Sequence, residues 1–307
     1  MIIIHLYIFP SYKMITINHV MSVNTKSSIF EDFINRLSTF DPEKYRHVMS
    51  KDPIIGSSIY HYHRPNKCNE ILNNSVCTIH FDLLDLRQHD NINATLTKMN
   101  SFKHLVFINK NEYQRWEFTY AKKHLINHGY DAALLLRNQK YPHNKVNIAL
   151  FSKYYQDGRK GNIYLQKIIN SIPAEKVNFY LIGRDWEFSS LSKNKNVKIF
   201  NPEDYNTLVH IYSIIDLVLI CSPYEGGPAS LPEAISAGCR VISSDCGMAR
   251  EFIYEKDMLS FDLEKDLALI FKHISYIENN VKQSYRKKPQ RWEEIASSYH
   301  DIYGMIL

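Results

Sequence analysis

Two glutamates, Glu225 and Glu233, stand eight residues apart in a segment whose residue types suit a phosphate-bearing sugar ligand. The segment Leu217–Glu251 reads as a buried strand ending at Cys221, a Glu-Gly-Gly-Pro loop and a helix. Glycines let backbone N–H groups approach a ligand closely, and the start of a helix carries partial positive charge suited to a phosphate. A carboxylate at Glu225, directly before the two glycines, could accept hydrogen bonds from sugar hydroxyls.

Glu233 has a structural explanation as well as a functional one. Ser230 is a good residue to cap a helix, Pro232 is tolerated in the first turn, and a glutamate three residues after the cap completes a capping box. The helix is expected to end at Gly238. Glu233 could also bind a ribose diol, but the capping box alone would account for it. Glu225 is therefore the stronger functional candidate.

This segment resembles the E-x7-E signature of retaining glycosyltransferases of family 4. The resemblance runs through SPYEGGPASLPEAISAGCRVISSDCG and covers strand, loop, helix and the next strand. It implies that Glu225 contacts the donor sugar and that Glu233 contacts the nucleotide ribose. The backbone at Gly226, Gly227, Ser230 and Leu231 would then face the sugar and diphosphate.

A basic turn, SKYYQDGRKGN at Ser152–Asn162, resembles a second part of the same family. Family members place cations here, which neutralise the donor diphosphate. In this chain the candidates are Lys153, Arg159 and Lys160, the last followed by a glycine. Charge is needed because a nucleoside diphosphate leaves, and without a metal Lys and Arg must stabilise it. The spacing between Lys153 and Lys160 departs from the family pattern, so the choice between Arg159 and Lys160 stays open.

Histidines mark the third matching region. The runs Ile59–Pro65 and Val76–Asp82 resemble two consecutive strand ends of the family, and the second normally ends in a histidine that faces the reaction centre. His80 takes that place, and His63 is a weaker candidate. Two departures fall on the acceptor side. The stretch 12–28 contains no glycine, and Arg137-Asn138 replaces the His-Gly or Asn-Gly that the family has near the domain junction.

Short apolar runs alternate with helix-like stretches, which favours parallel sheets covered on both faces. In the first half we expect helices over Ile29–Phe40, near Ile92–Met99 and over Arg115–Asn127. Strands are expected at Ile2–Phe9, Tyr45–Met49, Ser58–Tyr62, Ser75–His80, Leu105–Asn109 and Ala132–Leu136.

The second half repeats the scheme. Strands are expected at Val146–Phe151, Val177–Ile182, Val197–Phe200, Leu217–Cys221, Arg240–Ser243 and Met258–Phe261. Helices are expected at Asn162–Ile172, Tyr205–Ser213, Leu231–Ala237, Ala249–Ile253 and Leu263–Asn279, followed by a closing helix with Trp292, Ile295, Tyr299, Ile302 and Ile306 along one stripe.

The resulting fold class is α/β, with two Rossmann-like, doubly wound domains facing a central cleft. The closing helix, with Trp292, Tyr299 and Tyr303, resembles the last helix of the family, which implies the GT-B arrangement and a C-terminal helix that crosses back to the first domain. We assign 1–140 to an acceptor-side domain, 141–285 to a nucleotide-sugar domain and 286–307 to the returning helix. Ligands of such sheets bind beyond the carboxyl ends of the strands.

Composition indicates in which cellular compartment the protein is expected. The 307 residues include five cysteines without metal-type spacing, so we expect reduced thiols in a cytoplasmic protein. The apolar run at residues 1–9 is too short to span a bilayer. Residues 1–140 hold 17 Lys and Arg against 12 Asp and Glu, and ten of the fourteen histidines. This modest basic excess leaves open a peripheral contact with the inner face of a membrane, although an ordinary solvated surface explains it equally well.

The sequence lacks the motifs that are typical of several other enzyme classes. Neither GxGxxG after a strand nor a P-loop occurs, and no Asp-x-Asp is present. We expect a metal-independent hexosyltransferase without a cofactor, and the resemblance to family 4 implies that it retains the anomeric configuration. It would use a nucleotide-diphosphate sugar as donor and a saccharide or lipid-linked saccharide as acceptor, for cell-surface polysaccharide or glycoconjugate synthesis. No nucleic-acid partner is expected. The alternatives are an inactive GT-B partner subunit, a glycan-binding protein, or a GT-B sugar-nucleotide epimerase or hydrolase.

Overall fold

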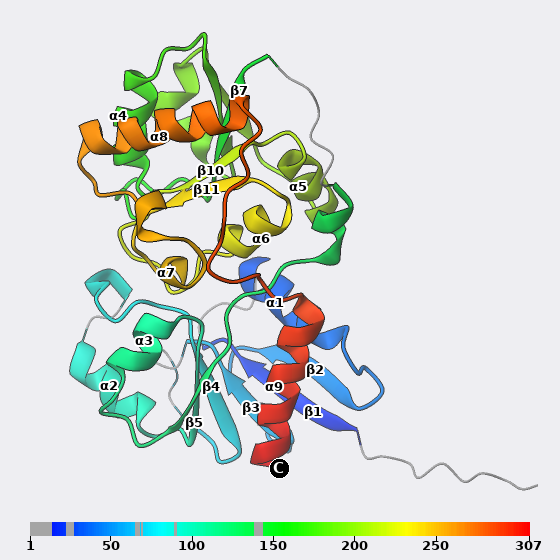
Figure 1. Cartoon of the computed structure of the whole chain (residues 1–307). Coiled ribbons are helices and arrows are strands. Elements are labelled where there is room, and N and C mark those ends of the chain that lie inside the picture. Colours follow the sequence, from blue (N-terminus) through cyan, green and yellow to red (C-terminus); the bar gives the residue numbers. More distant parts are fainter. Residues whose placement is uncertain (1–13, 23–27, 65–67, 69, 89–90, 138–143) are drawn as a thin grey trace, which may run out of the picture.

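The structure is a computed structural model that describes residues 14–22, 28–64, 68, 70–88, 91–137 and 144–307. It contains two parallel sheets, one above the other in Figure 1, each with its own helices. The first sheet has six strands in the order β2-β1-β3-β4-β5-β6, and the second has five in the order β11-β10-β7-β8-β9. Both orders start near the middle and reverse direction, as in doubly wound folds.

Helices lie against both faces of the first sheet. Its strands are β1 (Ile15–Val20), β2 (Tyr45–Ser50), β3 (Ile59–Tyr62), β4 (Ser75–Ile79), β5 (His104–Phe107) and β6 (Lys122–Leu125). Helices α1 (Ser28–Ser38) and α9 (Trp292–Ile306) cover one face and share an apolar core with it. Helices α2 (Ile92–Met99) and α3 (Lys110–Arg115) lie by the other. Helix α9 thus returns from the end of the chain to the sheet formed first (Figure 1).

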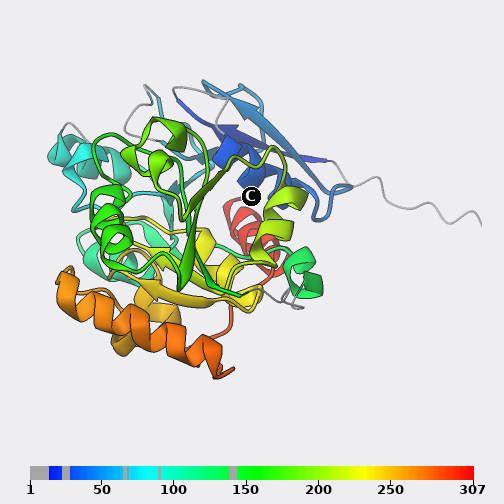
Figure 2. The ribbon, with the colours of Figure 1, turned by 90° about the horizontal axis from the view of Figure 1, so that it is seen from above.

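The second sheet is the more regular of the two. Its strands are β7 (Val146–Phe151), β8 (Val177–Ile182), β9 (Val197–Phe200), β10 (Leu217–Ile220) and β11 (Arg240–Ser243). Its helices are α4 (Asn162–Ser171), α5 (Tyr205–Tyr212), α6 (Ser230–Ser236), α7 (Ala249–Phe252) and α8 (Leu263–Glu278). Helix α8 runs along the outside of this sheet (Figure 2).

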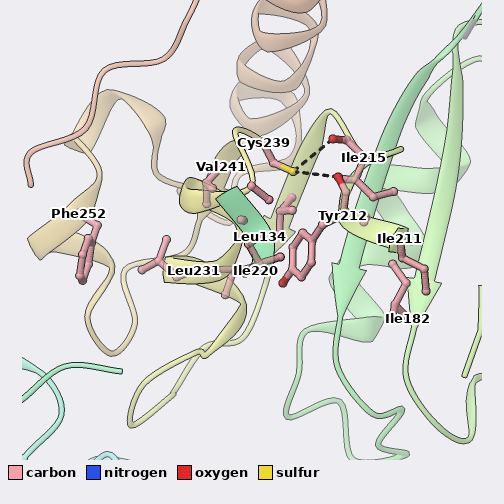
Figure 3. Close-up of a cluster of buried hydrophobic side chains, with 14 of the residues drawn as sticks. Leu134, Ile182, Ile211, Tyr212, Ile215, Ile220, Leu231, Cys239, Val241 and Phe252 are labelled. Carbon is pink, nitrogen blue, oxygen red and sulfur yellow. Dashed lines mark hydrogen bonds between the residues drawn. The ribbon is translucent and has the colours of Figure 1, made fainter. Parts of the chain in front are cut away.

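Buried apolar side chains hold α5 and α6 against β10 and β11. Tyr212 and Leu231 are fully buried in this cluster (Figure 3). The Cys239 thiol donates to the backbone oxygens of Tyr212 and Ile215 over 3.7 and 3.2 Å. This core fixes the start of α6, and with it the position of Glu233, relative to α5.

Most expected elements are confirmed to within one or two residues, including all of the second-half helices. Three expectations are wrong. The helix expected at Arg115–Asn127 is a short helix, α3, followed by strand β6. The strand expected at Ala132–Leu136 is a 3-10 helix over Ala132–Arg137. Met258–Phe261 forms only an isolated bridge, between Met258 and Ser243.

Strand β1 was missed because Ile15–Val20 carries two buried polar residues, Asn18 and His19, within a short apolar run. The strand expected at Ile2–Phe9 lies outside the described residues. Within the described part of the chain, no helix combines the length and apolar character needed to cross a membrane.

Candidate active site

A cavity of about 720 Å³ opens between the carboxyl ends of the two sheets. Residues from α1, from the ends of β3 and β4, and from α9 line its first-domain wall. The basic turn, the Glu-Gly-Gly loop and the start of α6 line the opposite wall. The residues that line the cavity include Arg36, His63, His80, Lys153, Lys160, Ser222, Glu225, Ser230 and Glu233.

The Glu-Gly-Gly loop touches the first domain directly. A Cβ added to Gly226 would stand 2.2 Å from the backbone oxygen of His80, so only glycine permits this approach. The Asn109 amide donates to the Gly226 backbone oxygen over 2.6 Å. A Cβ on Gly227 would meet the Ile108 side chain at 3.0 Å. The two glycines therefore set how closely the domains approach, while Glu225 beside them lines the cavity.

Glu225 is held by two partners from its own domain. Its Oε1 accepts a hydrogen bond from the Ser222 hydroxyl over 2.8 Å and forms an ion pair with Lys160. The carboxylate side chain is 14% exposed and the Lys160 side chain 27%. Both remain within reach of a ligand in the cavity, and Ser222 fixes the orientation of the carboxylate.

The basic turn separates the three cationic candidates. Lys153 lines the cavity and pairs with Asp185 over 2.9 Å, while Lys160 lines it and pairs with Glu225. Arg159 pairs with Asp157 over 2.6 Å and is not among the residues that line the cavity. The turn ends at Gly161.

Position 161 requires a glycine for two reasons. Its φ is +74°, in the left-handed region, and a Cβ would stand 2.0 Å from the Cys221 backbone oxygen. The turn therefore lies directly against the end of β10, which brings Lys160 to Glu225.

Glu233 does not form the predicted capping box. The residue before α6 is Ala229, which makes no side-chain capping bond, and Ser230 lies inside the helix. The Glu233 carboxyl group instead accepts hydrogen bonds from the hydroxyls of Tyr205 and Tyr212, over 3.2 and 3.0 Å. The chain provides these better-placed donors from α5, so the carboxyl group points toward them and away from its own helix start.

Burial raises the pKa of Glu233 to about 7, against the opposing influence of Arg36 and of the two tyrosine hydroxyls. A carboxyl group kept away from water with a pKa near neutrality changes its charge readily. The position lies in the cavity wall, 9% exposed. Perturbed acids of this kind are common at functional sites.

The structure places the remaining predicted residues in different surroundings. Ser230 lines the cavity, whereas the Leu231 side chain belongs to the buried core. Gly226 packs against the first domain, and Gly227 lines the cavity. His80 and His63 both line the first-domain wall, and their rings are joined by a hydrogen bond of 3.0 Å. Burial lowers the pKa of each well below its ordinary value.

Sequence reasoning missed the part of the wall built by Arg36 and Tyr205, and the buried Tyr212 that also bonds Glu233. The Arg36 guanidinium lies 4.3 Å from the centre of the Tyr205 ring and pairs with Asp131 over 3.0 Å. Tyr205 and Tyr212 are seven residues apart, so they lie on one face of α5. That spacing was visible in the sequence, but it is equally typical of core packing.

The decisive comparison is with sequence families. The family described as glycosyl transferases group 1 matches residues 137–298, which is more than half of the chain and includes every second-domain residue of the site. The chain belongs to this family. A search of curated proteins by sequence found no match.

Solved structures with the same fold include three glycosyltransferase-type proteins. The sucrose-phosphate synthase of Thermosynechococcus elongatus has a TM-score of 0.68 at 14% identity, covering 96% of this chain and 99% of the other. The lipopolysaccharide outer core galactosyltransferase WaaB gives 0.60 at 12%, covering 95% and 96%. WaaG, a glycosyltransferase involved in lipopolysaccharide biosynthesis, gives 0.61 at 13%, covering 95% and 97%. The fold is therefore GT-B over nearly the whole chain.

Proposed function

We propose that the protein transfers a sugar from a nucleoside-diphosphate donor to a saccharide or lipid-linked saccharide, with retention at the anomeric carbon. The observation that carries the proposal is the convergence of Lys160, Glu225 and Glu233 on one cavity of a group 1 glycosyltransferase. Binding of a sugar nucleotide needs three kinds of group. They are a cation for the diphosphate, a carboxylate for the sugar and a carboxyl group for the ribose. Retention and the donor roles rest on the resemblance to family 4.

In the proposed reaction, the bond between the anomeric carbon and the diphosphate oxygen breaks, and the electron pair leaves with the diphosphate. Lys153 and Lys160 provide positive charge for this leaving group, and no metal is required for that purpose. Glu225 holds the sugar by accepting hydrogen bonds from the sugar hydroxyls. The acceptor hydroxyl approaches from the first-domain wall, which carries His63 and His80.

Glu233 would hold the nucleotide ribose. Its carboxyl group is already oriented by Tyr205 and Tyr212, so a ribose diol meets a fixed acceptor. Pre-organisation of this kind reduces the entropy lost on binding. The fold alone does not choose the acceptor, because both a sucrose-phosphate synthase and lipopolysaccharide transferases share it.

The test is a panel of UDP-, GDP- and dTDP-sugars, first in thermal-shift binding and then in turnover with cell-envelope saccharides and glycolipids. Formation of a glycoside whose anomeric configuration, measured by NMR, matches that of the donor supports the proposal. Donor binding without any turnover would favour the inactive partner subunit. Conversion or hydrolysis of the donor without an acceptor would favour the epimerase or hydrolase.

A further inference from the structure

Four histidines form an unbroken hydrogen-bonded row across the first sheet. His80 directly follows β4, His63 directly follows β3, His19 lies in β1 and His47 lies in β2. Their ring nitrogens are joined over 3.0 Å (His80–His63), 2.9 Å (His63–His19) and 2.8 Å (His19–His47). The row therefore crosses four neighbouring strands, from the cavity at the end of β4 to the sheet edge at β2.

The row runs beneath the two helices that cover this face. Alternate residues of a strand share a face, and His19 lies between Ile17 and Met21, both in the core beneath α1 and α9. The Phe33 ring of α1 stands edge-on to the rings of His63 and His80, 5.6 and 5.7 Å away. The helices exclude water from the row, so the rings serve as one another's hydrogen-bond partners.

The three contacts have the same polarity. In each, the Nε2 of the ring nearer the cavity meets the Nδ1 of the next ring toward the edge. A neutral imidazole has one N–H donor and one acceptor nitrogen. If every ring carries its proton on Nε2, all three bonds are satisfied at once, and the same holds if every ring carries it on Nδ1. Burial keeps the rings neutral, since it lowers the pKa of all four, that of His47 to about 4.

The two ends of the row meet different surroundings. His80 and His63 line the cavity. At the other end, His47 is only partly buried, and its Nε2 lies 3.4 Å from the Nε2 of His300 in α9. Asp41, Lys44 and Asp301 influence His300 electrostatically. The row thus connects the cavity with a charged part of the surface.

A metal site is the competing reading. His19, His61 and His63 offer ring nitrogens within 4.8 Å of one another. However, His61 is fully engaged elsewhere, because its two nitrogens meet the Tyr303 hydroxyl and the Thr78 hydroxyl, each over 2.7 Å. Both nitrogens of His19 and of His63 belong to the row. A metal would have to replace bonds that already satisfy all six nitrogens.

We propose that the row His80-His63-His19-His47 is a proton relay that carries the proton of the acceptor hydroxyl out of the cavity during sugar transfer. The proposal rests on the proposed function. When donor and acceptor fill the cavity, they separate His80 from bulk water. The acceptor oxygen forms its bond to the anomeric carbon, the diphosphate leaves with its electron pair, and the acceptor proton passes to Nδ1 of His80.

Each ring then hands the proton on its Nε2 to the Nδ1 of the next. His47, whose Nε2 lies beside His300 at the partly exposed sheet edge, releases one proton there to water. One proton has entered the row and one has left it, so every ring stays neutral. After the product leaves, the row resets in reverse: a proton enters at His47, and His80 loses its Nδ1 proton to water in the open cavity. No ring has to rotate.

The bonding pattern can be tested without activity. In protein labelled with 15N-histidine, NMR should show one tautomer shared by His63, His19 and His47, with couplings between nitrogens across the hydrogen bonds. Adjacent rings with opposing tautomers would overturn the relay. So would a stoichiometric metal whose binding shifts the 15N signals of His19 and His63, because it would occupy their nitrogens.

The kinetic test replaces the central ring. Gln at position 19 accepts from one neighbour and donates to the other, but an amide does not pass protons on as imidazole does. We expect His19→Gln to lower kcat at least about tenfold with the donor KM unchanged, and to enlarge the solvent isotope effect in D2O. The matched control is His61→Gln, which removes an equally buried histidine outside the row. It should keep the wild-type kcat and isotope effect.

A second variant and its control keep the test valid if His19→Gln does not fold. His47→Gln interrupts the row at its partly exposed end, and His124→Gln is its control, since His124 pairs with His104 on the far strands over 3.0 Å. A folded His47→Gln or His19→Gln protein with wild-type kcat and isotope effect would overturn the relay while leaving sugar transfer intact. If the wild type itself transfers no sugar, the proposed function fails and the relay fails with it.

Discussion

The ammonium group of Lys160 contacts the carboxylate of Glu225, although the two residues are 65 positions apart in the chain. Gly161 makes the contact possible by packing against Cys221 at the end of β10. The pair joins the basic turn to the Glu-Gly-Gly loop before any ligand arrives. In the proposed reaction, sugar and diphosphate bind on either side of this pair, so each of its members can be tested separately.

We expect Glu225→Gln to lower kcat/KM about a hundredfold, on the order of 3 kcal/mol of barrier, because the amide loses the charge that orients Lys160 and binds sugar hydroxyls. Steady-state transfer rates with the preferred donor give the measurement. Glu175→Gln, an exposed turn residue, is the control. Equal rates for the two variants would remove Glu225 from the reaction.

Lys160 and Arg159 are neighbours in the chain, but their surroundings differ. We therefore expect Lys160, and not Arg159, to bind the diphosphate. Lys160→Ala should lower kcat about a hundredfold, since it removes a cation from the cavity wall. Arg159→Ala should have little effect, because that guanidinium pairs with Asp157 away from the cavity lining. Initial rates and binding of the nucleoside diphosphate should agree. The reverse order of effects would contradict the assignment.

Gly226 limits the distance between the domains. Gly226→Ala forces a methyl group against the His80 backbone oxygen, and overpacking of this kind costs about 1–3 kcal/mol. We expect a lower Tm together with a lower kcat/KM. In contrast, Gly304→Ala places its methyl group in open space on helix α9 and should stabilise the protein by about 0.5–1 kcal/mol. A Gly226→Ala protein with wild-type Tm and activity would show that the domains do not need this contact.

Glu233 should make stability depend on pH. Its pKa is raised from 4.5 to about 7 in the folded protein, so between these values the folded state keeps a proton that the unfolded state releases. The free energy of unfolding therefore falls as the pH rises through this range, by up to about 3 kcal/mol.

Urea unfolding of the wild type and of Glu233→Gln at pH 5 and pH 8 isolates this contribution. The buried histidines act in the opposite direction, since their lowered pKa values make stability rise with pH, but they are common to both proteins. The wild type should lose more stability than the variant between the two pH values. Parallel pH profiles would contradict the raised pKa.

Metal removal tests the proposed role of the cations. Dialysis against EDTA should leave kcat unchanged, and added Mg²⁺ or Mn²⁺ should not restore a Lys160→Ala protein, because a lysine at this place acts as a fixed charge. Loss of wild-type activity on chelation, with recovery on adding metal back, would contradict metal-independent transfer.

The second domain could be predicted closely because its strands are predominantly apolar and its helices have clear boundaries. In the first domain, strands β1 and β6 could not be predicted, because they carry polar side chains. His19 and Asn18 concealed β1, and the edge strand β6 is a polar run of four residues, Lys122–Leu125. Tertiary hydrogen bonds satisfy these groups, and a single sequence does not display them.

The site shows the same limit. The positions of Glu225 and Lys160 follow from local spacing and the resemblance, but their contact depends on the approach of Gly161 to Cys221. For Glu233 the local pattern predicted a capping box, whereas the fold provides two tyrosines from α5 as partners. Local rules described the helix correctly in length but not the direction of this carboxyl group.

Helix α9 gives the two domains different histories during synthesis. Its residues Ile295, Tyr299 and Tyr303 complete the core of a sheet whose strands end at Leu125. The ribosome therefore delivers all of the first sheet, and then the whole second domain, before the first sheet receives its last cover. The half of the protein that is made first is the half that finishes folding last, and until then its histidine row is covered by α1 alone.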